Sequence, residues 1–339
     1  MILNYNIHNK VSIIVNDPSD EISIFLEQEL NEFSVSSLEK IDVEINFVKK
    51  IKIPISSIKL LKDFYYDNQK KCLFLERDGK LISYYIDKFN DGYININVEY
   101  GFSKWFILYA IEKSLYVLMG RKKCCMLHAG AIVKNGKATV ISALQAGGKT
   151  LQIINEVSNG AEFLGDDLIF VTENGECLSH PRRVNFNQFH GKHYDIASKI
   201  HWESLHLLNK IKWVFSKEKI KSLISSSCLR PTIRMSLSSI YTSIHLPKRV
   251  IVDNVLIKIH ALSENHKASM WSDSEYCNFL LENMRYEVTS HITPYISSLI
   301  ACNDKYIVDI SSYINDIEEE RKRILLCFLG SVSKKVECA

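Results

Sequence analysis

The stretch LHAGAIVKNGKATVISALQAGGKT, residues 127–150, decides the fold. Two runs rich in β-branched and small apolar residues lie on either side of Asn135-Gly136. Asn-Gly is the strongest short signal for a two-residue hairpin, because both residues accept the positive φ that the turn needs. A glycine-containing loop follows, and residues 150–158 then have helical character, with Gly160 closing the helix. The stretch therefore predicts an antiparallel hairpin, a loop and a helix, in that order.

The loop ends in Gly147-Gly148-Lys149-Thr150, directly before the predicted helix. The first N–H groups of a helix lack intrahelical partners and bind phosphate oxygens well, and glycine lets the backbone approach them closely. A lysine followed by a hydroxyl residue suits the β/γ-phosphates and Mg²⁺, as in the pattern G-x-x-x-x-G-K-[ST]. Ala143 stands where that pattern has its first glycine. The alternative is an ordinary glycine turn with a solvated lysine.

Two further elements support a phosphate site. Asp166-Asp167 follows the predicted helix beside an apolar run, and two carboxylates there suit one Mg²⁺ ligand and one base for an attacking hydroxyl. The alternative is a simple turn. His128 lies on the first strand of the hairpin, where an imidazole could contact a phosphate or share a proton with an aspartate. The alternative for His128 is a hydrogen-bonded core histidine.

In this order, the segment resembles the catalytic core of HPr serine kinases and the wider HPr kinase-like group, which includes kinases that modify lasso peptides. The resemblance covers about residues 120–190 and implies a fold similar to phosphoenolpyruvate carboxykinase, with an antiparallel hairpin before the P-loop. The positions that match the family pattern are His128, Lys149, Thr150, Asp166 and Asp167. Ala143, Gln145 and Ala146 depart from the family's loop, which has Gly, Ser and Gly there.

The resemblance implies a kinase that uses ATP or GTP with Mg²⁺ and transfers a γ-phosphoryl group to a hydroxyl, with a serine or threonine of a peptide or protein as the acceptor. It makes His128, Asp166 and Lys149 catalytic, with Asp166 as the base. Thr150 and Asp167 would hold the metal, although the roles of the two aspartates could be reversed. The expected nucleotide-binding residues are Gly147, Gly148, Lys149, Thr150 and Arg182.

Two other functions stay open. The altered loop would suit a nucleotide-binding regulator with little catalysis, and the same core would suit a small-molecule kinase acting on an amino acid or sugar. The first hundred residues match the substrate-binding domain of HPr kinases poorly, which argues against HPr itself as the substrate. HPr kinases are hexameric, so a homo-oligomer is among the expectations.

The composition restricts the class of protein further. The 339 residues are 46% hydrophobic and carry a formal net charge of +3, which excludes a mostly disordered chain and gives no reason to expect nucleic-acid binding. Nine cysteines without a C-x-x-C pair suit a reduced cytoplasmic protein. No leader is visible, and residues 105–120, the most apolar stretch, are too short and too charged to span a membrane.

The expected fold class is therefore α/β, with a mixed, largely antiparallel sheet in residues 105–339 and a smaller α/β module in residues 1–104 that could recognise the substrate. Charges around Glu318–Glu320 are interpreted as a solvated helix face, and a zinc site among His180, His190, His193 and His201 is a minor alternative. Further expected helices cover 21–33, 105–120, 195–227 and 314–329; further expected strands cover 11–15, 43–48, 71–85 (a hairpin), 92–100, 168–179 (a hairpin) and 251–262.

Overall fold

The computed structural model describes residues 1–61, 64–67, 69–85, 91–144, 147–180, 184–186, 233–235, 248–259, 271–289 and 305–338. They form a mixed α/β protein, as the composition and patterning predict. The chain divides into two compact units. Unit 1 comprises residues 1–128, 170–176 and 271–331, and unit 2 comprises residues 129–169, 177–270 and 332–339.

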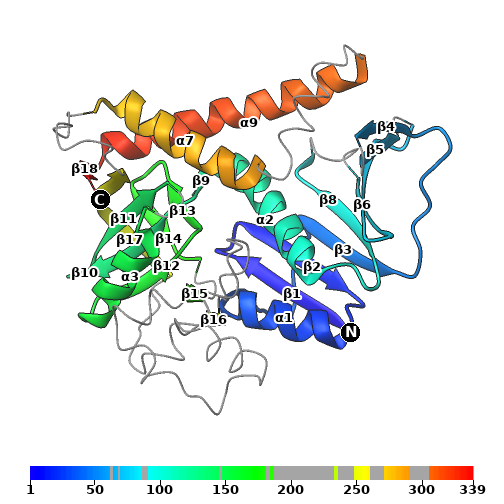
Figure 1. The fold of residues 1–339 in the computed structure, drawn as a ribbon, viewed down its shortest axis with the longest axis horizontal. Helices are drawn as coiled ribbons and strands as arrows, with labels where there is room; N and C mark the ends of the chain where they lie inside the picture. The colour runs from blue at the N-terminus through cyan, green and yellow to red at the C-terminus, as the bar shows by residue number, and fades with distance from the viewer. Residues whose placement is uncertain are drawn as a thin grey trace, which may run out of the picture. The chain divides into compact units, whose positions relative to one another are not determined.

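Unit 1 contains an eight-stranded sheet in the order β1-β2-β3-β8-β7-β6-β5-β4, drawn in blue to cyan in Figure 1. The pairs β2–β3 and β3–β8 are parallel and the others antiparallel, so the sheet is mixed. The strands are β1 (Ile2–Ile7), β2 (Val11–Asn16), β3 (Val43–Val48), β4 (Ile58–Leu61), β5 (Phe64–Asp67), β6 (Cys72–Arg77), β7 (Lys80–Tyr85) and β8 (Ile94–Glu99).

Local sequence explains most of this sheet. In β2, Val11, Ile13 and Val15 are buried while the residues between them are half-buried, which is the period-two pattern of a strand with one core face. The β6–β7 hairpin turns at Asp78 and Gly79, whose φ angles of 50° and 70° are those of the predicted turn. The expected strands 11–15, 43–48 and 92–100 and the hairpin 71–85 are thus confirmed.

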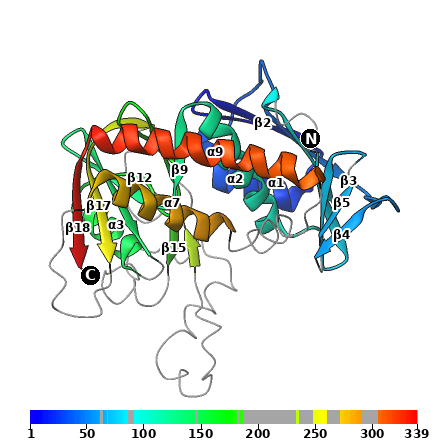
Figure 2. The ribbon, with the colours of Figure 1, turned by 90° about the horizontal axis from the view of Figure 1, so that it is seen from above.

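The α-helices of unit 1 are α1 (Asp20–Leu30), α2 (Lys104–Arg121), α7 (Asp273–Thr289) and α9 (Lys305–Gly330). The expected helix 21–33 ends in a 3-10 turn, Asn31–Phe33, and the expected helix 105–120 is α2. The last helix begins at Lys305, well before the predicted start at residue 314. Helices α7 and α9 pack against each other and against β9 (Cys124–Leu127), as Figures 1 and 2 both show. Strand β9 pairs with β13 (Ile169–Thr172).

Unit 2 is built on a sheet in the order β12-β10-β11-β17-β14. Its strands are β10 (Gly130–Lys134), β11 (Lys137–Ala143), β12 (Glu162–Gly165), β14 (Glu176–Leu178), β17 (Arg249–Ile259) and β18 (Ser333–Cys338). Strand β18 runs parallel to β17, beside it in Figure 2, and β15 (Val184–Phe186) pairs antiparallel with β16 (Ile233–Met235). Helix α3 (Lys149–Ser158) packs on β10.

The decisive stretch folds as its sequence predicts. Strands β10 and β11 are antiparallel, and they turn at Asn135 and Gly136, whose φ angles are 52° and 73°. The chain then passes through the loop into α3, and Gly160 has a φ of 91° just past the end of this helix. The expected strand 251–262 is found as β17.

Some expectations have no counterpart in the described residues. The predicted helix 195–227 lies outside them, and the domain boundary at residue 104 stays a prediction. No helix in the described ranges is long and apolar enough to cross a membrane.

Candidate active site

The candidate site lies at one edge of the unit 2 sheet. Strand β10 is antiparallel to both β11 and β12, so β11 and β12 run in the same direction and end at the same edge. The glycine loop leaves the end of β11 and Asp166 follows the end of β12. Helix α3 connects the two strands and begins at this edge. Topology alone therefore brings the loop and the aspartates together.

Two glycines shape the start of α3. A Cβ on Gly147 would lie 2.8 Å from Ala143 Cβ and 2.9 Å from Leu144 O, so only glycine fits there. Gly148 precedes the helix with a φ of 77°, in the left-handed region that favours glycine, and among the described residues no side chain caps the helix N-terminus. Ala143, the last residue of β11, is buried. Gln145 and Ala146 lie outside the described residues.

Lys149 and Thr150, the first residues of α3, both contact the aspartates. The buried Lys149 Nζ donates a hydrogen bond to Asp167 Oδ1 at 2.8 Å and lies 3.9 Å from Asp166 Oδ1. Thr150 Oγ1 donates to Asp166 Oδ2 at 2.9 Å. The four side chains therefore form one hydrogen-bonded and ion-paired cluster, which brings together four of the site residues that the sequence predicts.

The two aspartates have different surroundings. Asp166 is 3% exposed, and burial together with the negative charge of Asp167 raises the pKa of its carboxyl group to about 6, although Lys149 and Thr150 oppose the rise. Asp166 Oδ1 has no hydrogen-bond partner among the described residues. The side chain of Asp167 is 40% exposed, and its φ of 70° is left-handed, a conformation that aspartate tolerates better than most residues. Two adjacent carboxylates thus differ in solvent access and proton affinity.

The strand before the aspartates is closely packed. A Cβ on Gly165 would meet the backbone oxygens of His180 and Leu168 at 3.0 Å each, and His180 N donates to Leu164 O at 2.9 Å. His180 is buried beside this strand, and the other histidines of the zinc alternative, His190, His193 and His201, lie outside the described residues. No group of three or more His, Cys, Asp or Glu residues suited to a metal occurs in the described part of the chain.

His128 does not lie on the first strand of the hairpin, as the sequence predicts, because that strand, β10, begins at Gly130. It is a buried residue of unit 1 that directly follows β9. Its Nδ1 lies 3.2 Å from Asn283 Oδ1, and Asn283 Nδ2 donates to the His128 carbonyl oxygen at 3.2 Å. Sequence reasoning did not find Asn283, which lies 155 positions along the chain on α7. The predicted nucleotide-binding residue Arg182 lies outside the described residues.

One prediction about α9 is wrong. Its charges were interpreted as a solvated face, but Arg321 is fully buried. Arg321 Nη2 donates to Met126 O at 3.1 Å, Nη1 donates to Glu318 at 3.1 Å, and the guanidinium stacks 3.6 Å from the ring centre of Tyr116. The stacking and the bonds offset part of the cost of burying the charge, and burial lowers the pKa of Arg321 to about 9. Nothing in the local sequence distinguishes this arginine from its solvated neighbours.

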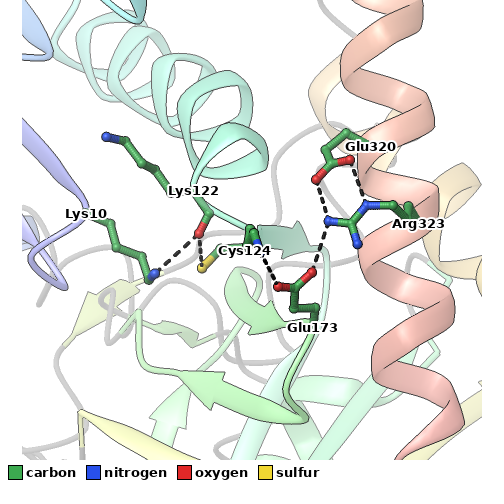
Figure 3. A network of polar contacts seen from close by, with 7 residues as sticks. Lys10, Lys122, Cys124, Glu173, Glu320 and Arg323 are labelled. Carbon is green, nitrogen blue, oxygen red and sulfur yellow. Dashed lines mark hydrogen bonds and ion pairs between the residues drawn. The ribbon is translucent and has the colours of Figure 1, made fainter.

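A separate polar network in unit 1 is exposed and does not resemble a site (Figure 3). Glu173, in the turn after β13, pairs with Lys123 and with Arg323 at 3.0 Å each, and Arg323 also bonds Glu320. These hydrogen bonds hold the pKa of Glu173 below its usual range. The network links the turn after β13 to α9. Exposed ion pairs of this kind contribute little to stability.

Comparison with known proteins adds no assignment. No protein-family model matches the chain, and no curated protein matches it significantly. The functional argument therefore depends on the cluster formed by Lys149, Thr150, Asp166 and Asp167.

Proposed function

We propose that this protein is an HPr kinase-like phosphotransferase that uses a nucleoside triphosphate and Mg²⁺ to phosphorylate a hydroxyl, with a serine or threonine of a peptide or protein as the acceptor. The observation that carries the proposal is the cluster itself. A buried lysine and a hydroxyl residue, placed at an uncapped helix start, pair with two carboxylates from the end of a neighbouring strand.

The residues present fit a nucleotide with Mg²⁺. The glycine-only position at Gly147 leaves room where backbone must approach phosphate oxygens closely. Asp166 Oδ1 is a buried carboxylate oxygen without a hydrogen-bond donor among the described residues, which a cation would satisfy. Mg²⁺ takes one or two carboxylates and otherwise phosphate oxygens and water, so it needs no larger protein cage.

Each residue then has a role. Lys149 Nζ and the N–H groups at the start of α3 bind phosphate oxygens, and Lys149 exchanges its bond to Asp167 for one to phosphate. Thr150 Oγ1 and a carboxylate hold the metal, which neutralises charge on the transferred group when it is bound. Positioning and charge neutralisation provide most of the rate enhancement in this class of reaction.

The geometry favours the reversed assignment of the aspartates. Thr150 already bonds Asp166, so these two residues form the metal-holding pair. The side chain of Asp167 is 40% exposed and can reach an incoming hydroxyl, so Asp167 is the better placed base. His128 orients or assists the base by sharing a proton with it, as the resemblance implies.

The test is transfer of labelled γ-phosphate from ATP or GTP, with Mg²⁺, to a panel of serine- and threonine-containing peptides. Lys149→Ala should abolish transfer, whereas Lys137→Ala, which breaks an exposed pair with Asp253, should not. Asp166→Asn should raise the Mg²⁺ concentration needed for half-maximal rate, and Asp167→Asn should lower kcat at an unchanged Mg²⁺ requirement. Absence of transfer and of nucleotide turnover across the panel refutes the kinase.

Two outcomes would redirect the assignment. Nucleotide binding by calorimetry without turnover would indicate the regulator that the altered loop first suggested. Transfer to free amino acids or sugars, with none to peptides, would indicate a small-molecule kinase.

A further inference from the structure

Asn283 on α7 and His128 after β9 form a buried pair in unit 1. Asn283 is 4% exposed and His128 is 9% exposed. Two contacts of 3.2 Å join them: Asn283 Nδ2 donates to His128 O, and Asn283 Oδ1 faces His128 Nδ1. One amide thus contacts both the backbone and the imidazole of the same histidine.

This pairing determines where the imidazole carries its proton. A carbonyl oxygen only accepts hydrogen bonds, so the Asn283 group that faces His128 O must be the NH₂ group. The amide oxygen therefore faces Nδ1, and an oxygen acceptor requires Nδ1 to be the protonated nitrogen. In the neutral ring, the lone pair then belongs to Nε2.

A second side chain holds the same strand. Arg321 on α9 donates to Met126 O at 3.1 Å, two residues before the carbonyl that Asn283 holds. Met126 lies on β9 and His128 follows the end of this strand, whose strand neighbour in the described residues is β13. Arg321 and Asn283 therefore each hold a backbone carbonyl of the segment that carries His128.

We propose that Asn283 is a positioning residue, which holds neutral His128 as the Nδ1–H tautomer and leaves Nε2 as its proton acceptor. The rate effect rests on the proposed kinase function, in which His128 accepts a proton or hydrogen bond during transfer. The tautomer itself is independent of that function. Loss of a partner that orients a functional histidine typically costs about 10- to 100-fold in activity.

The experiment is ¹⁵N NMR of the imidazoles in the full-length chain, with the His128 signals assigned by their loss in His128→Gln. Wild type should show a protonated Nδ1 and an unprotonated Nε2. Asn283→Ala should lose this preference and lower kcat about 10- to 100-fold, with the KM for nucleotide unchanged. Asn278→Ala, at an exposed asparagine on the same helix, is the matched control and should change neither the His128 tautomer nor kcat.

Asn283→Asp is a second variant, which tests the proposal even if Asn283→Ala fails to fold. Its carboxylate still accepts from Nδ1, so the tautomer should persist, while the added negative charge favours the imidazolium and moves the acid limb of the pH–rate profile to higher pH. A purely structural role would not move that limb. A wild-type spectrum with the proton on Nε2, or an Asn283→Ala spectrum identical to wild type, overturns the proposal.

Different results would refute the kinase function and the positioning role of Asn283. If wild type transfers no phosphate, the kinase function falls and the rate effect with it, while the spectra still decide whether Asn283 sets the tautomer. If transfer occurs but Asn283→Ala keeps both the wild-type spectrum and the wild-type rate, the kinase stands and the positioning role falls.

Discussion

Asp166→Asn should make the protein more stable at neutral pH while impairing the proposed activity. In the folded chain, burial and the charge of Asp167 raise the pKa of Asp166 to about 6. An aspartate in an unfolded chain has a pKa of about 3.9. The folded protein therefore pays a free-energy penalty to ionise this side chain, and asparagine removes that penalty because it carries no charge.

The direction and size of the expected change in the free energy of unfolding follow from the two pKa values of Asp166. Below pH about 4 the carboxyl is protonated in both states, so ionisation costs no stability. Between pH about 4 and 6 the folded state keeps the proton that the unfolded state loses, so wild-type stability falls as pH rises. Above pH about 6 the penalty is complete, at about 1.36 kcal/mol for each unit of difference, or about 3 kcal/mol.

Urea unfolding of wild type and Asp166→Asn, at several pH values between about 4 and 8, measures this directly. The stability of the variant relative to wild type should grow by about 3 kcal/mol across that range. Any constant cost of the amide cancels in the comparison. Asp253→Asn removes an exposed carboxylate that pairs with Lys137, and its difference from wild type should stay within about 1 kcal/mol.

A difference that does not change with pH would refute the reasoning, because it would mean that the folded environment does not disfavour the Asp166 carboxylate. A difference that shrinks as pH rises would mean that Lys149 and Thr150 outweigh burial and the charge of Asp167. Either result would show that the residues around Asp166 already stabilise its carboxylate. The case for a bound cation at this carboxylate would then be lost.

Three further perturbations test the same structure. Lys149→Met leaves both carboxylates of the site without their cation and should lower the free energy of unfolding by about 2–4 kcal/mol in urea titrations at pH 7. Gly147→Ala places a methyl group 2.8 Å from Ala143 Cβ and should abolish nucleotide binding by calorimetry while circular dichroism stays unchanged. Lys113→Met should stabilise unit 1 by about 1–3 kcal/mol at pH 7, because burial lowers the pKa of Lys113 to about 8; the gain should fall as pH rises past about 8 and disappear above pH about 11, where the lysine is neutral in both states.

The parts of the fold that could be predicted are those that depend on neighbouring residues. Asn135-Gly136 and Asp78-Gly79 each require positive φ at both positions, so a short sequence determines the turn and the register of the strands beside it. The glycine loop and the aspartates were found because their residue types suit phosphate and Mg²⁺ chemistry. Each of these signals extends over fewer than about ten residues.

Other elements gave no such signal. Strand β9 is buried along its whole length, and a short continuous apolar run does not separate strand from helix by periodicity. In β1, the outward face carries Ile2 and Asn4, so the alternation is weak. Asn283 and Arg321 contact β9 from 155 and 195 positions along the chain, so neither contact leaves a local pattern.

The candidate site is also where the chain departs most from the ordinary rules for a stable structure. Asp166 is a buried carboxylate with an oxygen that lacks a hydrogen-bond donor among the described residues, Asp167 has a left-handed backbone, and Lys149 is a buried cation. The buried carboxylate and the left-handed backbone cost stability, and Asp166→Asn would relieve the first of these costs. Features of this kind collect at functional sites, because there the cost supports ligand binding. The Glu173–Arg323 network carries as many charges without these costs, so strain and burial, rather than charge alone, distinguish the edge of unit 2 as the candidate site.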